Sequence, residues 1–419
     1  PSTPSGLGYN DWELGYDAKT GYAPGYVGTG PFMMVNGSTQ QGYLTANKAW
    51  ELFANPYYFV QYTNASTYAS FTANNTWATP SLWHQYTPKI AAVEYPYYST
   101  LSGAVTAMSE GLVQTITEGV TPSFVPVVDT FANTYIFHKS SSGYGYMQLN
   151  SYSSQAPMNI TAFRQALNYA TDKAYLATVI DSGYDILGQP IIPPSDPLWR
   201  NDSTPSYSYN PAKAEALIAS IPGMVNTSGV WYYNGNKVTA DIQITSAGPN
   251  PLGVEGALVI AQEWGGIGVP TTVTQESFTT LIPNLENYNY NVISLGITGI
   301  AGDPTGDYFA FYNYNLGNGT GFYLGPWSNT TFGGKSLTGA QVNDTMNNLT
   351  LKLNSISSLV TRTSISDEIQ GLAAVESTMI NLGYGIDILP FTNTTFTNIS
   401  EIDVPYTAYM YWAVLTTHT

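Results

Sequence analysis

The stretch Thr161-Ala162-Phe163-Arg164-Gln165-Ala166-Leu167-Asn168-Tyr169-Ala170-Thr171-Asp172-Lys173 carries the clearest structural signal in the chain. Its apolar side chains recur at the spacing of a helix with one buried face. The members of that face, continued by two further alanines, are Phe163, Ala166, Leu167, Ala170, Ala174 and Ala177. Thr161 has the hydroxyl that commonly caps a helix N-terminus. The stretch therefore predicts an amphipathic helix that packs on an apolar surface.

Strands and helices alternate on both sides of this stretch. Strands are predicted where short apolar runs are bounded by turn residues, at 90–97, 135–137, 146–149, 238–245, 269–275, 292–295 and 386–391. Helices are predicted from helical periodicity at 46–53, 99–111, from 211 to about 218, and at 253–265, 278–285, 339–354 and 367–382. This alternation indicates an α/β architecture with βαβ units.

The composition limits the class of protein. The chain has 419 residues, of which 43% are hydrophobic, enough for two lobes with cores of their own. Charged residues make up 10%, against about 25% in typical soluble proteins. The net charge of −16 argues against a nucleic-acid partner, because no basic surface exists to neutralise phosphates. So few charges suit either an acidic medium near the reference carboxylate pKa of about 4 or the polar surface of an exported protein.

Twelve Asn-X-Ser/Thr sequons run along the chain. They are Asn36, Asn64, Asn74, Asn159, Asn201, Asn226, Asn318, Asn329, Asn343, Asn348, Asn393 and Asn398. We interpret them as acceptors of N-linked glycans on an exported, extracellular protein. No apolar run approaches the roughly 20 residues of a membrane span, and no signal peptide opens the chain. A signal and a membrane anchor are therefore expected outside this sequence.

Residue patterns for catalysis or metal binding are missing. There is no cysteine, and His84, His138 and His418 lie far apart in the sequence. No Gly-X-Ser-X-Gly or His-Glu-X-X-His motif occurs. The acid pair Asp303 and Asp307 is better interpreted as turn and cap residues than as glycosidase carboxylates. We predict no enzyme activity, no cofactor and no metal site.

Several short segments, in order, resemble the extracellular solute-binding proteins typified by the oligopeptide- and dipeptide-binding proteins of ABC importers (family 5). Gly28-Thr29-Gly30-Pro31-Phe32 resembles the family's Gly-Thr-Gly-Pro-Phe/Tyr turn, and Tyr209-Asn210-Pro211-Ala212-Lys213-Ala214 resembles Tyr-Asp-Pro-X-Lys-Ala. Residues 163–173 are similar to Val-Arg-Gln-Ala-Leu-X-X-Ala-Ile-Asp-Arg/Lys, and Ile388-Leu389-Pro390-Phe391 resembles a late Ile-Pro-Leu strand. The chain is identified as a member of this family, and we expect an archaeal one.

The resemblance implies a two-lobed periplasmic-binding-protein-like α/β fold with mixed sheets and hinge-crossing strands. We expect residues 1–134 and 396–419 to form lobe one and residues 135–395 to form lobe two. The crossings are expected near residues 135–150 and 391–402. Because only 27 residues precede the Gly-Thr-Gly-Pro turn, the N-terminal part of lobe one is expected to be missing. The resemblance further implies hinge closure on a small-molecule ligand and docking on an ABC permease.

The segment Gly296-Ile297-Thr298-Gly299-Ile300-Ala301-Gly302-Asp303-Pro304 resembles Gly-Trp-Thr-Gly-Asp-Asn-Gly-Asp-Pro of peptide-binding relatives. The first aspartate there anchors the peptide's amino group, and its position is Ile300 here. The ligand-binding residues predicted from this resemblance are Gly296, Ile297, Thr298, Gly299, Ile300, Asp303, Tyr308 and Tyr312.

An ammonium group without its carboxylate partner is costly in a closed cleft. We therefore favour a neutral oligosaccharide over an oligopeptide as ligand. Aromatic faces for a sugar are expected from the downstream residues Tyr308, Phe311, Tyr312, Tyr314, Tyr323 and Trp327. The alternative function is a cell-surface structural or adhesive glycoprotein that reuses the solute-binding fold.

Overall fold

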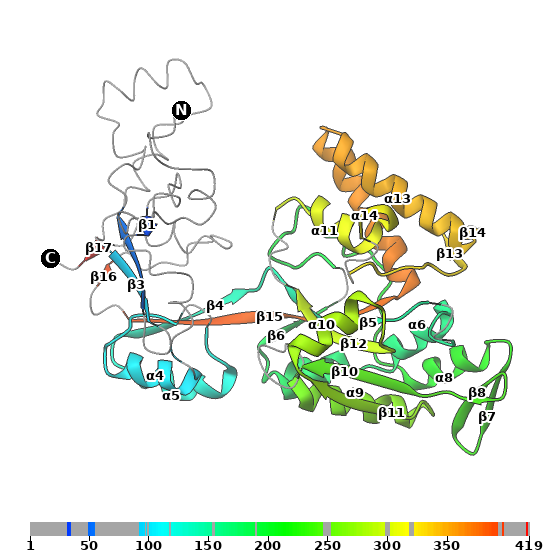
Figure 1. Cartoon of the computed structure of the whole chain (residues 1–419), viewed down its shortest axis with the longest axis horizontal. Helices are drawn as coiled ribbons and strands as arrows, with labels where there is room; N and C mark the ends of the chain where they lie inside the picture. Colours follow the sequence, from blue (N-terminus) through cyan, green and yellow to red (C-terminus); the bar gives the residue numbers. More distant parts are fainter. Residues whose placement is uncertain are drawn as a thin grey trace, which may run out of the picture. The chain divides into compact units, whose positions relative to one another are not determined.

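The computed structural model describes residues 32–34, 49–54, 92–96, 98, 100–116, 119–152, 156–188, 191–245, 253–297, 302–317, 322–392, 396–397 and 416–417. The chain divides into two compact units. Unit 1 comprises Pro1–His138 and Ile388–Thr419, and unit 2 comprises Lys139–Asp387. The chain passes between the units twice, within strand β4 (Thr134–Ser140) and within strand β15 (Met379–Thr392) (Figure 1).

Unit 1 contains an antiparallel sheet in the order β1-β2-β3, formed by Phe32–Met34, Ala49–Ala54 and Ala92–Pro96. Helix α4 (Leu101–Ser109) follows, and Thr100 caps it by accepting from the Gly103 N–H at 3.1 Å. A 3-10 turn η5 (Pro122–Phe124), α5 (Val125–Val128) and the pair β16 (Phe396–Thr397) and β17 (Thr416–Thr417) complete its described elements. The helix predicted at 46–53 is wrong, because Ala49–Ala54 pairs with strands on both sides.

Unit 2 is built on a mixed sheet in the order β11-β10-β12-β5-β15-β4, with β6 (Asp185–Leu187) paired to β15. β10 (Ala240–Thr245) runs parallel to β11 (Thr271–Glu276) and to β12 (Val292–Ile297), whereas β5 (Tyr144–Leu149) is antiparallel to β12 and to β15. Helices α9 (Gly253–Gly266) and α10 (Phe278–Glu286) connect the three parallel strands. These βαβ units confirm the α/β prediction.

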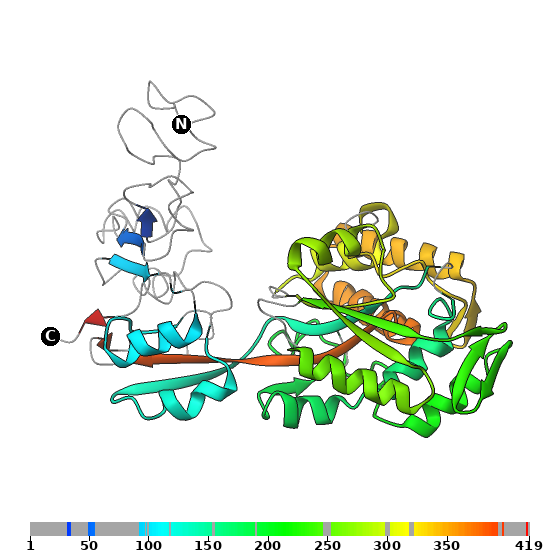
Figure 2. The same ribbon diagram turned by 60° about the horizontal axis from the view of Figure 1, so that its bottom comes forward.

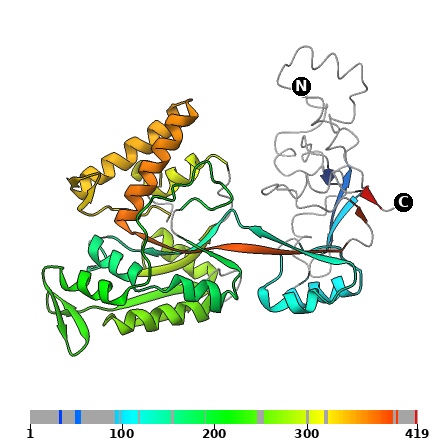
Figure 3. The ribbon, with the colours of Figure 1, turned by 180° about the vertical axis from the view of Figure 1, so that it is seen from behind.

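Helices cover both faces of this sheet. On one face α6 (Thr161–Tyr169), α8 (Pro211–Ala219) and α9 pack on β5 residues Met147 and Leu149. On the other face α11 (Thr305–Tyr312), α13 (Gly339–Ser355) and α14 (Leu359–Glu376) pack on Tyr144 and Tyr146 of the same strand. Figures 2 and 3 show α13 and α14 (orange) and α9 (green) on opposite sides. The alternation along β5 places odd- and even-numbered residues in two separate cores.

Smaller elements complete unit 2. They are α7 (Lys173–Tyr175), the π-helix η7 (Leu176–Ile180), the sheet β7-β8-β9 (Met224–Thr227, Val230–Tyr233, Asn236–Lys237), α12 (Tyr314–Gly317) and the hairpin β13-β14 (Thr330–Phe332, Lys335–Leu337). The helix predicted at 367–382 begins and ends earlier. Ser358 caps α14 at its start, and Ser377, in the left-handed conformation, ends it before β15 begins.

Helix α6 confirms the main structural prediction. Phe163, Ala166, Leu167 and Ala170 are fully buried on the mixed sheet of unit 2. Two details were wrong. The N-cap position is Ile160, which makes no side-chain cap, and the Thr161 hydroxyl instead accepts from Nη2 of Arg164 at 3.3 Å. The helix ends at Tyr169, so Ala174 lies in a separate short helix and is exposed.

Arg164 is a cation on the buried side of this helix, and its partners account for its burial. Its side chain is completely buried and forms an ion pair with the equally buried Glu376 of α14 at 3.0 Å. Its other nitrogens donate to the carbonyl oxygens of Glu376 and Met158, both at 3.0 Å, and to the Ser328 hydroxyl at 3.2 Å. Because each nitrogen has a partner, the buried charge joins α6, α14 and the segment before β13.

Candidate functional site

The candidate site lies at the edge of the unit 2 sheet where β10 and β12 end. Parallel strands bring their carboxyl ends to one edge, and β5 begins there, since Tyr144 is the register partner of Ile297. In open α/β sheets, ligands bind outside the carboxyl ends of the strands. Gly296 is exposed and Ile297 is half-buried at this edge. Thr298, Gly299 and Ile300 follow directly and lie outside the described residues.

Asp303 holds the far end of this loop. It accepts from the Thr305 backbone N–H at 3.2 Å and from the Thr305 hydroxyl at 2.6 Å, which starts α11. Both of its carboxylate oxygens also accept from Nη2 of Arg362, at 2.7 and 2.5 Å. Partial burial alone would raise the pKa of Asp303, but the hydrogen bonds from Thr305 and Arg362 outweigh burial and lower it. Asp303 is therefore charged and already paired within the protein.

Arg362 connects the loop to the helices behind it. Its Nε donates to the Leu353 carbonyl at 3.0 Å, and its guanidinium carbon lies 5.1 Å from the centre of the Trp199 ring. Its Nη2 also donates to the Thr305 hydroxyl at 2.8 Å. The cation thereby ties the start of α11 to α13 and α14.

Asp196 is a second carboxylate at this loop, and the sequence analysis missed it. The Gly302 N–H donates to it, and its Oδ2 is buried without a hydrogen-bond partner among the described residues. Burial raises the pKa of Asp196, and the nearby charge of Asp303 adds to this, while the Gly302 hydrogen bond opposes it. The sequence offered one signal for Asp196, namely the turn-rich segment Pro193-Pro194-Ser195-Asp196-Pro197, in which it is the single acidic residue. Its contact with residue 302 is not local in sequence.

Tyr308 and Tyr312 lie in the core of unit 2. Both are fully buried, and the Tyr308 hydroxyl shares a 2.7 Å hydrogen bond with that of Ser366. Phe311 is buried beside them, with its ring centre 6.1 Å from that of Tyr312. In this structure neither tyrosine ring presents an exposed face.

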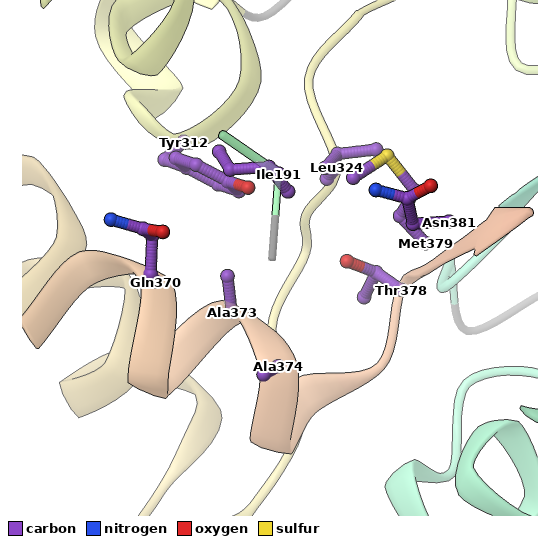
Figure 4. A pocket seen from close by; sticks show the side chains of 9 residues that line it. All are labelled: Ile191, Tyr312, Leu324, Gln370, Ala373, Ala374, Thr378, Met379 and Asn381. Atoms are coloured by element: carbon purple, nitrogen blue, oxygen red, sulfur yellow. The ribbon is translucent and has the colours of Figure 1, made fainter. Parts of the chain in front are cut away.

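The described part of unit 2 contains at least two hollows. The first is a small cavity of about 30 Å³, into which the Tyr312 and Thr378 hydroxyls point in Figure 4. It has room for about one water molecule and not for a solute. The second is an open groove of about 270 Å³ lined by Tyr314, Tyr323, Pro326, Trp327, Gly339, Ala340 and Asn343. Neither hollow is lined by the described residues of the segment, 296, 297, 302 and 303.

Six sequon asparagines lie in the described part of the chain. Asn226, Asn329 and Asn348 are exposed, and Asn159, Asn201 and Asn343 are half-buried. Asn343 accepts from the Tyr323 hydroxyl at 2.9 Å. Asn36, Asn64, Asn74, Asn318, Asn393 and Asn398 lie outside the described residues. Glycosylation stays a prediction.

Among the described residues, no group of three or more histidine or acidic side chains could hold a metal ion. The helices within the described ranges include none with the length and apolar character needed to cross a bilayer.

The sequence model of the bacterial extracellular solute-binding proteins, family 5 (middle region), matches residues 3–319. The chain therefore belongs to this family, which confirms the resemblance carried by residues 28–32, 163–173 and 209–214.

Individual relatives match over shorter stretches. Heme-binding protein A of Haemophilus influenzae is 29% identical over 153 residues, which cover 36% of this chain and 26% of that protein. The dipeptide-binding protein of Escherichia coli is 25% identical over 161 residues, which cover 38% of this chain and 28% of the relative. The aligned stretches thus span about a quarter of the length of these curated relatives.

Among solved structures, the oligopeptide-binding protein AppA of Bacillus subtilis, in complex with a nonapeptide, is similar with a TM-score of 0.64 and 16% identity. The superposition covers 93% of this chain and 66% of that one. At such low identity the likeness shows the fold alone. The fold is the two-lobed α/β architecture of periplasmic binding proteins, as the sequence predicted.

Proposed function

We propose that this chain is the ligand-capturing part of an extracellular receptor that delivers a solute to an ABC importer. The observation that carries the proposal is the family match over residues 3–319. The geometry of unit 2 supports it, because β10 and β12 end together at the kind of sheet edge where ligands bind in open α/β sheets. Asp303 and Asp196 hold the described end of the loop after β12 through Thr305, Arg362 and Gly302.

We also propose that the two lobes close on the solute, with lobe one formed by residues 1–134 and 396–419 and lobe two by residues 135–395. The two passages of the chain through β4 and β15 support this division, because paired crossing strands suit a hinge. A ligand that contacts both lobes only in the closed state shifts the population toward that state. The closed form would then dock on the permease.

For the ligand we propose a neutral solute, with an oligosaccharide preferred and an oligopeptide as the alternative. The position of the family's amine anchor is the uncharged Ile300. The adjacent described carboxylate, Asp303, pairs with Arg362 and is not free to replace the anchor. Because Tyr308 and Tyr312 are buried, sugar recognition would depend on polar groups of residues 296–300 rather than on these rings.

Calorimetric titration with a panel of neutral oligosaccharides and a panel of short free-amine peptides tests the proposal. The substitution Ile300→Asp should improve peptide binding by about 1.5–3 kcal/mol, the value of a hydrogen bond to a charged group. Val225→Asp, which adds the same charge on the exposed face of β7, is the matched control and should change nothing. Tight peptide binding by the unmodified protein, without a response to sugars, would overturn the ligand class. Failure to bind any member of a broad solute panel would count against the receptor itself.

A further inference from the structure

The segment between α7 and β6 has an unusual backbone. The π-helix η7 (Leu176–Ile180) is followed by Ser182 with φ of 54° and Gly183 with φ of 81°. π-helical turns are rare and are concentrated at functional positions, and positive φ is uncommon outside glycine. The chain then forms β6 (Asp185–Leu187). A conformation of this kind persists where surrounding contacts hold it in place.

Those contacts are made with β15 shortly before it leaves unit 2. β6 pairs antiparallel with Gly383–Gly385, so that Asp185 is opposite Gly385 and Leu187 is opposite Gly383. The Ile386 N–H extends the pairing by donating to the Tyr184 carbonyl at 2.9 Å. Asp387, the next residue, is the last of unit 2. Residues 181–187, here named the β6 clamp, therefore hold the crossing strand at its exit (Figure 1).

Two carboxylates lie in the β6 clamp. The Asp185 carboxylate rests against Gly383, where the Cβ of any other residue would overlap it. Its Oδ1 is buried and has no hydrogen-bond partner in the described part of the chain. The second carboxylate, Asp181, ends the π-helix and is also half-buried. A desolvated carboxylate without a compensating positive charge is unfavourable when ionised.

The surroundings do not supply a compensating charge among the described side chains. The titratable residues on the elements around the clamp are Lys173 on α7, Asp181 at the end of η7, Tyr384 and Asp387 on β15, His138 and Lys139 on β4, and Tyr144 on β5. Of the described ones, Asp181 is the charge that acts on Asp185, and it has the same sign. The guanidinium of Arg200 approaches Tyr384 at 5.0 Å but pairs with Asp202 at 2.6 Å.

The protonation of both groups follows from this environment. Burial, and then the charge of Asp181, raises the pKa of Asp185 to about 7 despite a hydrogen bond from Ile186. Burial raises the pKa of Asp181 to about 6. In an unfolded segment both would ionise near a pKa of about 4. The contribution of the two carboxyl groups to the stability of the folded clamp is thus complete below about pH 4. It is lost as pH rises through their folded-state pKa values.

We propose that the β6 clamp is a pH-sensitive device that holds β15 in acid and releases it near neutral pH. With both carboxyls protonated, β6 stays paired with Gly383–Gly385. When both ionise, desolvation and like-charge repulsion weaken the pairing, and the exit of β15 from unit 2 gains freedom. The device depends on residues 181–187 and 383–386 alone and is independent of the identity of the solute.

Amide hydrogen exchange at Ile386, measured on the whole chain, tests the proposal. After correction for the intrinsic exchange rate, protection should fall at least about tenfold between about pH 5 and about pH 7.5. Asp185→Asn and Asp181→Asn each remove one of the two ionising carboxyls, so each should leave an intermediate change, the smaller one in Asp185→Asn, and the double variant should reduce the change to less than about twofold. Asp202→Asn, an exposed acid outside the clamp, should behave like the unmodified protein.

Lys139→Gln serves as a second control, because it changes a charged residue on β4, which pairs with β15 and lies outside the clamp. Should Asp185→Asn fail to fold, Asp181→Asn alone still decides, since the proposal requires it to shrink the pH response. A pH response unchanged in the clamp variants, or absent from the unmodified protein, would overturn the proposal.

Discussion

Replacement of Arg164 by methionine should be among the most damaging single changes in unit 2. The arginine side chain is completely buried, and five hydrogen bonds, to Glu376, Met158, Ser328 and Thr161, depend on it. Methionine fills a similar volume but donates nothing. Removal of one partner from a buried ion pair costs about 3–5 kcal/mol, because the other charge is left uncompensated. We expect the free energy of unfolding to fall by that amount at neutral pH.

The loss should depend on pH in a defined direction. Burial raises the pKa of Glu376, while Arg164, the Ser328 N–H and Thr330 lower it. Without Arg164 the pKa of Glu376 rises further, so the variant takes up a proton that the unmodified protein does not bind. A group with a raised folded-state pKa contributes stability at low pH and loses it as pH rises. The difference between Arg164→Met and the unmodified protein should therefore shrink as the medium becomes acidic.

Urea unfolding followed by far-ultraviolet circular dichroism measures both effects. The matched control is Arg200→Met, since its partner Asp202 is 77% exposed and stays solvated when the arginine is removed. That change should cost no more than about 1–2 kcal/mol. The double variant Arg164→Met with Glu376→Gln should recover about 1–3 kcal/mol at neutral pH, because the buried carboxylate is gone. Equal losses for the two arginine variants, or a loss independent of pH, would refute the reasoning.

Two further predictions concern the glycines of β15 and Asp303 at the end of the segment 296–304. Gly383→Ala should destabilise unit 2 by about 1–3 kcal/mol through overlap with the Asp185 carboxylate, whereas the added Cβ of Gly385→Ala meets open space and should be tolerated. Thermal unfolding compares the two variants, and equal effects would contradict the packing argument. Asp303→Asn should cost about 1 kcal/mol, since the carboxylate is half exposed. Because its pKa is lowered, this contribution is present above about pH 4 and is lost below it, so urea midpoints of variant and parent should converge in acid.

The sequence by itself determined the family, the α/β class and the main buried helix face. These follow from local information. Phe163, Ala166, Leu167 and Ala170 recur at helical spacing, and any compact fold must bury such a face. The strands at 238–245 and 292–295 were predictable for a similar reason, since short apolar runs between turn residues pair in a buried sheet. The segment 296–304 was singled out by its resemblance to relatives, and its described ends lie at the end of β12 and just before α11.

Only the tertiary structure decided what those residues contact. Residues 49–54 form a strand because β1 and β3 pair with them, although their local pattern suits a helix equally well. Tyr308 and Tyr312 are buried in the core of unit 2, because side chains of α13 and α14 pack against α11. The contacts of Asp185 with Gly383 and of Arg164 with Glu376 join residues about two hundred positions apart. Charge burial depends on such partners, which arrive from distant segments, and no local pattern of residues encodes them.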